Sequence, residues 1–102
     1  MSERRHDRLE TSYQKLAASF LESVSDSKES LITVIHCSIN DSLRKAIVYI
    51  RVFPETHRDK ALLFANRRAK EFRMYVAEQS RGRFVPEFEF LIDPAQRIEE
   101  LL

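Results

Sequence analysis

The sequence is poor in residues that bend or cross-link a chain. Its 102 residues include one glycine, three prolines, one cysteine and no tryptophan. A single cysteine cannot form an internal disulfide, which argues against a disulfide-stapled secreted scaffold and favours a reducing compartment. The scarcity of glycine and proline excludes collagen-like and low-complexity chains. We therefore expect an ordinary folded protein.

Long apolar runs and a targeting segment are also missing. The longest apolar stretch, residues 31–35, is interrupted by Thr33 and is far too short to cross a bilayer. The first residues lack the apolar core of a signal peptide and are too acidic for a typical transit peptide. With 43% apolar and 32% charged residues, the chain is expected to be one soluble, cytoplasmic domain over residues 1–102.

The net charge of +1 hides an uneven distribution along the chain. Residues 58–83 hold eight basic and three acidic residues, a net charge of +5, whereas the rest of the chain carries −4. A positive segment of this kind attracts a phosphate backbone, because each neutralised phosphate releases counterions. The alternative is a solvent-exposed helix face with internal salt bridges. The charge pattern leaves both interpretations open.

Hydrophobic periodicity predicts a helix followed by a β-hairpin. Residues 4–24 repeat apolar side chains at helical spacing. Residues 31–39 are rich in β-branched side chains, and residues 45–53 alternate between two faces. The polar turn Asn40-Asp41-Ser42 joins these two strands, so we expect an antiparallel hairpin, which Pro54 ends.

The helical period returns after the hairpin and is followed by a third strand. Residues 56–79 are predicted to form one helix, or two helices that meet at a kink near residues 68–70. Gly82 is placed to end this helical stretch. Residues 84–93 alternate as a strand, and residues 94–102 can form a short helix. The order α-β-β-α(α)-β predicts an α+β fold in which helices cover one face of a three-stranded sheet.

No arrangement of residues for catalysis or metal binding is evident in the sequence. His6, His36 and His57 fall in different predicted elements, and Cys37 should point away from His36 on its strand. A two-ligand metal site is the alternative to packed or exposed histidines. Gly82 is isolated, so the chain has no glycine-rich loop that would hold phosphate. We expect no enzyme activity, no metal and no cofactor.

Three segments carry a resemblance to a known family. They are Leu43-Arg-Lys-Ala-Ile-Val-Tyr-Ile-Arg-Val-Phe-Pro54, the pair Phe72-Arg73, and Arg83-Phe-Val-Pro-Glu-Phe-Glu-Phe90 followed by Asp93. In this order they resemble ribosome-binding factor A, and a first helix before a Leu-Ile-Thr-Val strand is similar as well. The resemblance covers nearly the whole chain.

The resemblance implies a KH-like domain of type II topology, with a helix-kink-helix unit and a three-stranded sheet. It also implies a non-catalytic factor that binds the small (30S) ribosomal subunit through 16S rRNA in the neck region and assists processing of the 5′ end of this RNA. Asn40-Asp41-Ser42-Leu43 departs from the family's Ser-x-Asp-Leu turn. Arg68-Ala69-Lys70 stands where the family commonly has Ala-x-Gly, which predicts a softened or displaced kink. The Gly-x-x-Gly clamp of ordinary KH domains is absent too.

With this resemblance, the basic segment is predicted to contact RNA phosphates. The candidate RNA-binding residues are Lys60, Arg67, Arg68, Lys70, Arg73, Arg81 and Arg83. Arg68 and Arg73 flank the apolar stripe and are secondary candidates. Arg4, Arg5 and Arg8 would extend the surface if the first helix lies beside the basic one. We expect a monomer whose partner is the small subunit and its 16S rRNA, with no membrane and no small-molecule substrate.

The aromatic residues admit two roles. Phe88 and Phe90 could stack on bases, as in sheet-type RNA readers, but their alternation favours the core. Ile47, Tyr49 and Phe53 share the other face of the hairpin, where they could be exposed. This apolar face supports a second hypothesis, a protein-interaction module that docks a partner or a second copy of the chain.

Overall fold

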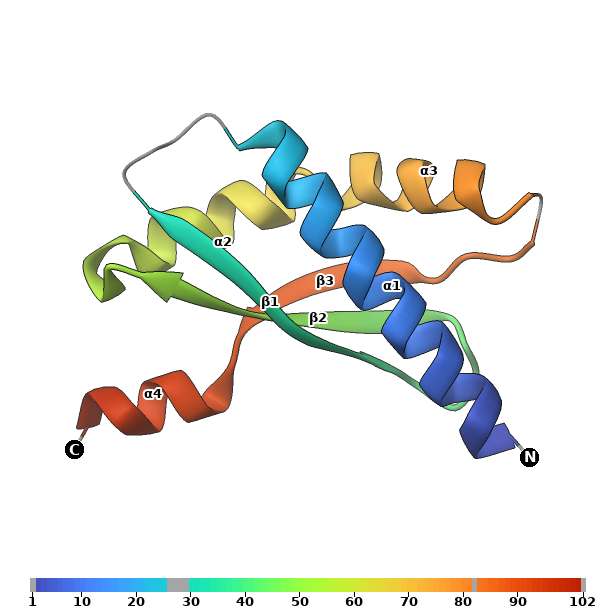
Figure 1. Cartoon of the computed structure of the whole chain (residues 1–102), viewed down its shortest axis with the longest axis horizontal. Coiled ribbons are helices and arrows are strands. Elements are labelled where there is room, and N and C mark those ends of the chain that lie inside the picture. The colour runs from blue at the N-terminus through green and yellow to red at the C-terminus, as the bar shows by residue number, and fades with distance from the viewer. Residues whose placement is uncertain (1, 26–29, 82, 102) are drawn as a thin grey trace.

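The computed structural model describes residues 2–25, 30–81 and 83–101 (Figure 1). Its elements are α1 (Ser2–Val24), β1 (Leu31–Ile39), β2 (Lys45–Phe53), the 3-10 turn η1 (Glu55–His57), α2 (Arg58–Arg67), α3 (Ala69–Gln79), β3 (Glu87–Ile92) and α4 (Pro94–Leu101). This order confirms the predicted α+β fold. Among the described helices, none is long and apolar enough to cross a membrane.

The sheet combines an antiparallel hairpin with a parallel strand pair. The strand order is β1-β2-β3, with β1 antiparallel to β2 and β3 parallel to β2. The parallel register runs from Lys45 opposite Glu87 to Ile50 opposite Ile92. Parallel neighbours need a long crossover connection, and α2 and α3 supply it.

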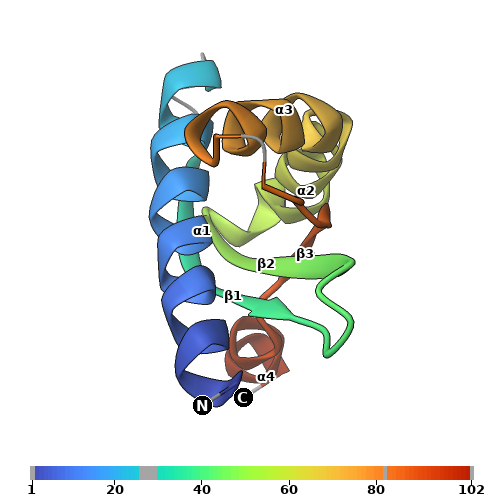
Figure 2. The same ribbon diagram turned by 90° about the vertical axis from the view of Figure 1, so that its right-hand side faces the viewer.

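Helices cover one face of this sheet and form the core. Figure 1 shows α1 crossing the strands, and Figure 2 shows α3 beside it. From the sheet, Val48, Ile50 and Phe90 are fully buried, and Phe88 nearly so, which confirms the prediction that the two phenylalanines belong to the core. The buried helix residues are Tyr13, Ala17, Phe20, Leu21, Ala61, Ala65, Phe72 and Val76. Phe72 lies among aromatic rings, with centroids 4.6 Å from Phe88 and 5.8 Å from Phe90.

The helical stretch after the hairpin is broken at Arg68. This residue has φ −97° and ψ 3°, between α2 and α3. Because its φ is negative, any L-residue can adopt this conformation, and the kink needs no glycine. Of the two alternatives, one helix or two helices meeting near residues 68–70, the structure has two helices. The displacement expected from the missing glycine is not found, because the break lies at Arg68 and Ala69 and Lys70 already belong to α3.

Two side-chain amides pair with strand backbone where the sheet has no neighbouring strand. Asn66 of α2 donates to the carbonyl of Phe90 (2.9 Å) and accepts from its N–H (2.8 Å), on the outer edge of β3. Gln96 of α4 does the same for Val52, at 2.7 Å and 3.0 Å, where β2 runs past the end of β3. Unpaired strand edges leave backbone groups unsatisfied and invite pairing with other chains. The two amides therefore close the sheet at these positions.

The third strand is shorter than predicted. It begins at Glu87 instead of residue 84, because Pro86 has no N–H and the Val85 carbonyl accepts hydrogen bonds from Arg73 at 3.0 Å and 3.3 Å. The predicted helix end at Gly82 lies outside the described residues. Instead α3 ends at Gln79, and Arg81 adopts a left-handed φ of 51°. The short final helix is confirmed as α4, and the Asp93 carboxylate accepts from the Ala95 N–H (3.3 Å) at its start.

Candidate nucleic-acid interface

The predicted basic surface begins on the outer side of α2 and α3. Lys60 and Arg67 stand seven residues apart on α2, close to two helical turns, so they share one side of the helix. Both are exposed, whereas Ala61 and Ala65 of the same helix are buried. Lys70 is exposed in the first turn of α3, just past the kink. The outer side of α2 and the first turn of α3 therefore present three cations, with the exposed Leu63 between Lys60 and Arg67.

Two of the predicted cations also bind within the fold. The Arg68 guanidinium lies 3.2 Å from the Glu71 carboxylate and 5.4 Å from the centroid of the Phe64 ring. Arg73 directs its guanidinium to the Val85 carbonyl. These contacts fix the position of each side chain. Arg73 thus fastens the segment that precedes β3.

Arg81 and Arg83 lie on a groove between α1 and the end of α3. The groove has a volume of about 1250 Å³ and includes Arg8 of α1 on its wall. Arg8 was expected to extend the basic surface if the first helix lies beside the basic one. In the structure α1 does pack beside α3. The side chains of Arg4 and Arg5 lie outside the described residues. The structure thus brings together three arginines, of which Arg8 is more than seventy positions from the other two in the sequence.

Most of the predicted cations have no acidic partner. Among the described residues, no carboxylate lies within 4.0 Å of Lys60, Arg67, Lys70, Arg81 or Arg83. The basic segment contains the Arg68–Glu71 pair and a 4.0 Å contact between Arg58 and Asp59. A helix face laced with salt bridges was the alternative interpretation, and the described part of the chain does not have that arrangement.

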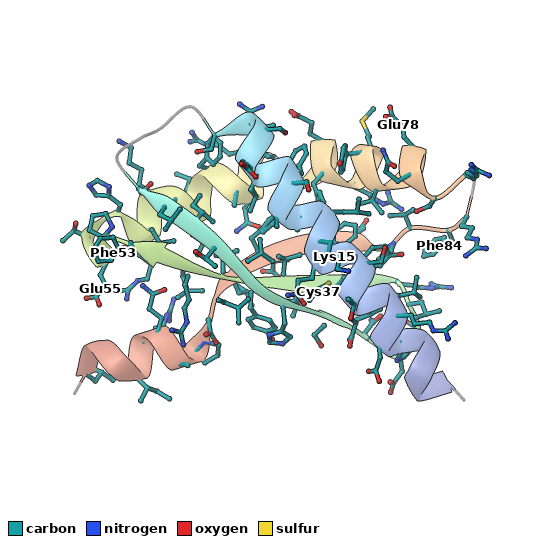
Figure 3. All side chains as sticks on the ribbon, in the orientation of Figure 1. Lys15, Cys37, Phe53, Glu55, Glu78 and Phe84 are labelled. Carbon is teal, nitrogen blue, oxygen red and sulfur yellow. The ribbon has the colours of Figure 1, made fainter. Side chains whose placement is uncertain are left out.

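The open face of the sheet carries a mixture of apolar and charged groups. His36 and Tyr49 are cross-strand neighbours whose rings stack with centroids 4.6 Å apart. The Arg51 Nε donates to the Asp93 carboxylate at 2.9 Å, and this hydrogen bond lowers the pKa of Asp93 below its ordinary value. Phe53 is 73% exposed. It lies at the end of β2, where Figure 3 labels it.

Cys37 and the histidines do not converge on a reactive site. Cys37 is 2% exposed, and burial, with a smaller contribution from Glu10, raises the pKa of its thiol to about 12. A thiol with so high a pKa is a poor nucleophile. His36 is exposed on the opposite face, as predicted. Within the described residues, no three His, Cys, Asp or Glu side chains are grouped so that they could hold a metal ion.

Comparisons of the sequence with family models and with known proteins identify its family. A family model described as ribosome-binding factor A matches residues 5–102. The chain belongs to the ribosome-binding factor A family. Ribosome-binding factor A of Thermodesulfovibrio yellowstonii is 32% identical over 93 residues, which are 87% of this chain and 79% of that protein.

Solved structures of ribosome-binding factor A share the fold. The crystal structure of the factor from Thermus thermophilus has a TM-score of 0.75, with 24% identity, over 85% of this chain and 94% of that chain. A homology model of the Thermus thermophilus factor, fitted into a cryo-electron-microscopy map of a 30S complex, has a TM-score of 0.72 with 25% identity, over 85% and 93% of the two chains. The fold is therefore KH-like, as the resemblance implied.

Sequence reasoning missed two features of the structure, the exposed Phe84 on the groove and the two amide pairs with strand backbone. Phe84 was predicted to begin a strand, but it lies outside β3, exposed on the arginine groove. The adjacent Arg83 and nearby Pro86 are the signal that could have found it, because proline delays the strand and basic residues beside an aromatic one are common at nucleic-acid surfaces. The amide pairs of Asn66 and Gln96 had no signal, since polar residues on helices are ordinarily exposed.

Proposed function

We propose that this chain binds the small ribosomal subunit through 16S rRNA and assists maturation of the subunit, including processing of the 5′ end of this RNA. Membership of the ribosome-binding factor A family supports this function. Further support comes from the Thermus thermophilus factor, whose coordinates were fitted into the map of a 30S complex.

The observation that carries the proposal is the set of exposed cations without acidic partners. Lys60, Arg67 and Lys70 project from α2 and α3, and no carboxylate among the described residues neutralises them. Holding several like charges on one face is unfavourable unless a partner of opposite charge binds there. Ribosomal RNA presents a dense array of phosphates, and these contacts would supply most of the affinity.

The proposed mode of action is binding without catalysis. The chain acts as one domain over residues 1–102, as a monomer in the cytoplasm, and it uses no cofactor and no small-molecule substrate. Folded RNA is recognised mainly by shape and backbone charge. The proposed contacts are Lys60, Arg67, Lys70, Arg81 and Arg83, with Arg68 and Arg73 as secondary contacts.

Co-sedimentation with purified small subunits across a salt series tests the function. An Arg67→Ala/Lys70→Ala variant should bind more weakly and lower the slope of log affinity against log salt by about 1–2, because each phosphate contact contributes about 0.7–0.9. A Lys15→Ala/Arg97→Ala variant removes the same charge from exposed positions on α1 and α4, and should keep the wild-type slope. Equal slopes for wild type and both variants would reject the assignment of these contacts. No binding by the wild type at low salt would reject the function.

The open end of the hairpin favours a second candidate function, the docking of a protein. Leu31 and Phe53 pair across the strands and are 65% and 73% exposed, so together they form a small exposed apolar patch. A Phe53→Ser variant that loses subunit binding while Arg67→Ala/Lys70→Ala retains it would favour a protein contact. The reverse result would leave rRNA as the partner.

A further inference from the structure

The arginine groove described above is built from three separate parts of the chain. Its walls come from the first half of α1, from the end of α3 with the following turn, and from the segment before β3. Its apolar surface is provided by Leu9, Tyr13, Ile39, Leu43, Phe84 and Pro86. Polar groups are added by Ser12, Gln79 and Ser80.

The charge of the groove has one sign. Arg8, Arg81 and Arg83 line it, and none of the described residues that line it is acidic. Glu10, two positions after Arg8, directs its carboxylate to the N–H of Ile39 at 2.8 Å. It is thereby engaged with the edge of β1. A ligand that complements this groove is therefore anionic.

Phe84 gives the groove an aromatic surface as well. Its side chain is 66% exposed, and it lies on the segment between α3 and β3 (Figure 3). Among the described residues, no other aromatic ring contacts it. The segment itself is anchored, because Val85 is buried and its carbonyl accepts from Arg73. The backbone beside Phe84 is therefore anchored, and its exposed ring is available for stacking.

Unpaired nucleotides are the ligands that need both features. A base offers a flat apolar face, and its flanking phosphates offer negative charge one nucleotide apart. In a duplex the base faces are covered by neighbouring pairs, so a duplex could use the arginines but not Phe84. An acidic peptide could also use the arginines, but it has no base to stack on the ring.

We propose that this groove binds one unpaired nucleotide of RNA, with its base stacked on Phe84 and its flanking phosphates contacted by Arg8, Arg81 and Arg83. The inference rests on the proposed binding of rRNA and adds a second, distinct contact to it. The outer face of α2 and α3 binds folded RNA through charge. The groove binds an unpaired base of the same RNA.

Fluorescence anisotropy with two labelled RNAs tests the groove. One RNA is a single-stranded octamer, and the other is a blunt duplex. A Phe84→Leu variant keeps the apolar volume but removes the aromatic face. It should bind the octamer about five- to hundredfold more weakly and the duplex as the wild type does, because a base stacked on an aromatic ring contributes that much to affinity. Phe84→Tyr should retain binding to both.

Two further measurements make the assignment specific. An octamer of abasic units should bind the wild type weakly, and Phe84→Leu should weaken it no further, since the base and the ring form one interaction. An Arg81→Gln/Arg83→Gln variant should lower the salt slope for the octamer by about 1.4, twice the value for one single-strand phosphate. Lys15→Gln/Arg97→Gln is the charge-matched control, because both residues are exposed and lie outside the groove and outside the proposed contacts on α2 and α3. Thermal unfolding of each variant verifies that the fold is retained.

The outcomes separate this proposal from the proposed function. If Phe84→Leu binds the octamer as tightly as the wild type, or weakens octamer and duplex equally, the groove does not stack a base and the proposal fails. A poly-glutamate peptide that binds more tightly than the octamer, and that Arg81→Gln/Arg83→Gln weakens, would identify the groove as a protein site and would overturn the proposal too. Co-sedimentation with small subunits reports on the function independently. Wild type that sediments with subunits, together with Phe84→Leu that keeps full octamer binding, would reject the groove alone.

Discussion

The amide of Asn66 gives the sharpest test of how the sheet is held together. An Asn66→Ala substitution removes both hydrogen bonds to the Phe90 backbone and leaves its N–H and carbonyl without these partners. Each bond contributes about 1 kcal/mol net, and the partly buried backbone groups left behind add a desolvation penalty of up to about 1 kcal/mol. Alanine returns about 0.6 kcal/mol of helix propensity. We therefore expect a loss of about 2 kcal/mol in the free energy of unfolding.

Urea and thermal unfolding measure this loss directly. Unfolding entropy for 102 residues is about 0.2 kcal/mol/K, so the midpoint temperature should fall by about 9 °C. Gln79→Ala, an exposed amide at the end of α3, is the matched control and should change stability by less than about 0.5 kcal/mol. Amide exchange of Phe90 should accelerate more than that of Val48 in the central strand. A loss below about 0.5 kcal/mol, or unchanged exchange at Phe90, would refute the role assigned to Asn66.

Three further substitutions or reactions test other parts of the structure. The Arg51 hydrogen bond lowers the pKa of Asp93 in the folded chain. The ionised carboxylate therefore stabilises the fold at pH values above the ordinary aspartate pKa of about 4, and this stabilisation is lost as the pH falls through the lowered pKa of the folded chain. Asp93→Asn should therefore be less stable than the wild type at pH 7 and approach it near pH 3 in urea titrations, whereas a difference independent of pH would contradict the assignment. The raised pKa and burial of Cys37 predict that a thiol reagent at pH 8 labels the native chain at least about a hundredfold more slowly than the unfolded chain, and similar rates would show that the thiol is accessible. Arg81→Gly relieves a left-handed conformation and should stabilise the fold by about 0.5–1 kcal/mol while weakening octamer binding, and a destabilised variant would show that the Arg81 side chain contributes to the fold.

The strands and helices could be predicted because their apolar residues repeat at the period of the element. On β2, Val48 and Ile50 are buried while Tyr49 and Arg51 lie on the open face, as the alternation predicted. On β3 the same alternation predicts that Phe90 is buried, as it is. These assignments depend on local spacing, which the sequence contains in full.

Features that depend on tertiary placement could not be predicted in the same way. Asn66 and Gln96 bind backbone groups 24 and 44 positions away, and a helix-forming window contains no trace of either partner. Arg8 joins the groove only because α1 packs beside α3, which the sequence analysis could state only as a condition. The end of α3 was predicted from glycine, but Arg81 takes the left-handed conformation that glycine usually provides. Neighbouring structure can hold such a residue in place, and composition does not reveal it.

The Asn66–Phe90 clamp also bears on the order in which the chain folds. The β1–β2 hairpin needs only a short turn, whereas pairing Lys45 with Glu87 joins residues 42 positions apart. Asn66 reaches β3 across 24 positions, from within the crossover itself, and so closes a shorter loop. We expect α2, α3 and β3 to assemble first and then to pack on the hairpin as one unit. Within this unit, the Asn66 amide would fix the orientation of β3 so that the Phe90 side chain faces the core. In stopped-flow refolding, Asn66→Ala should then slow folding more than it speeds unfolding, which would place this side chain in the folding nucleus.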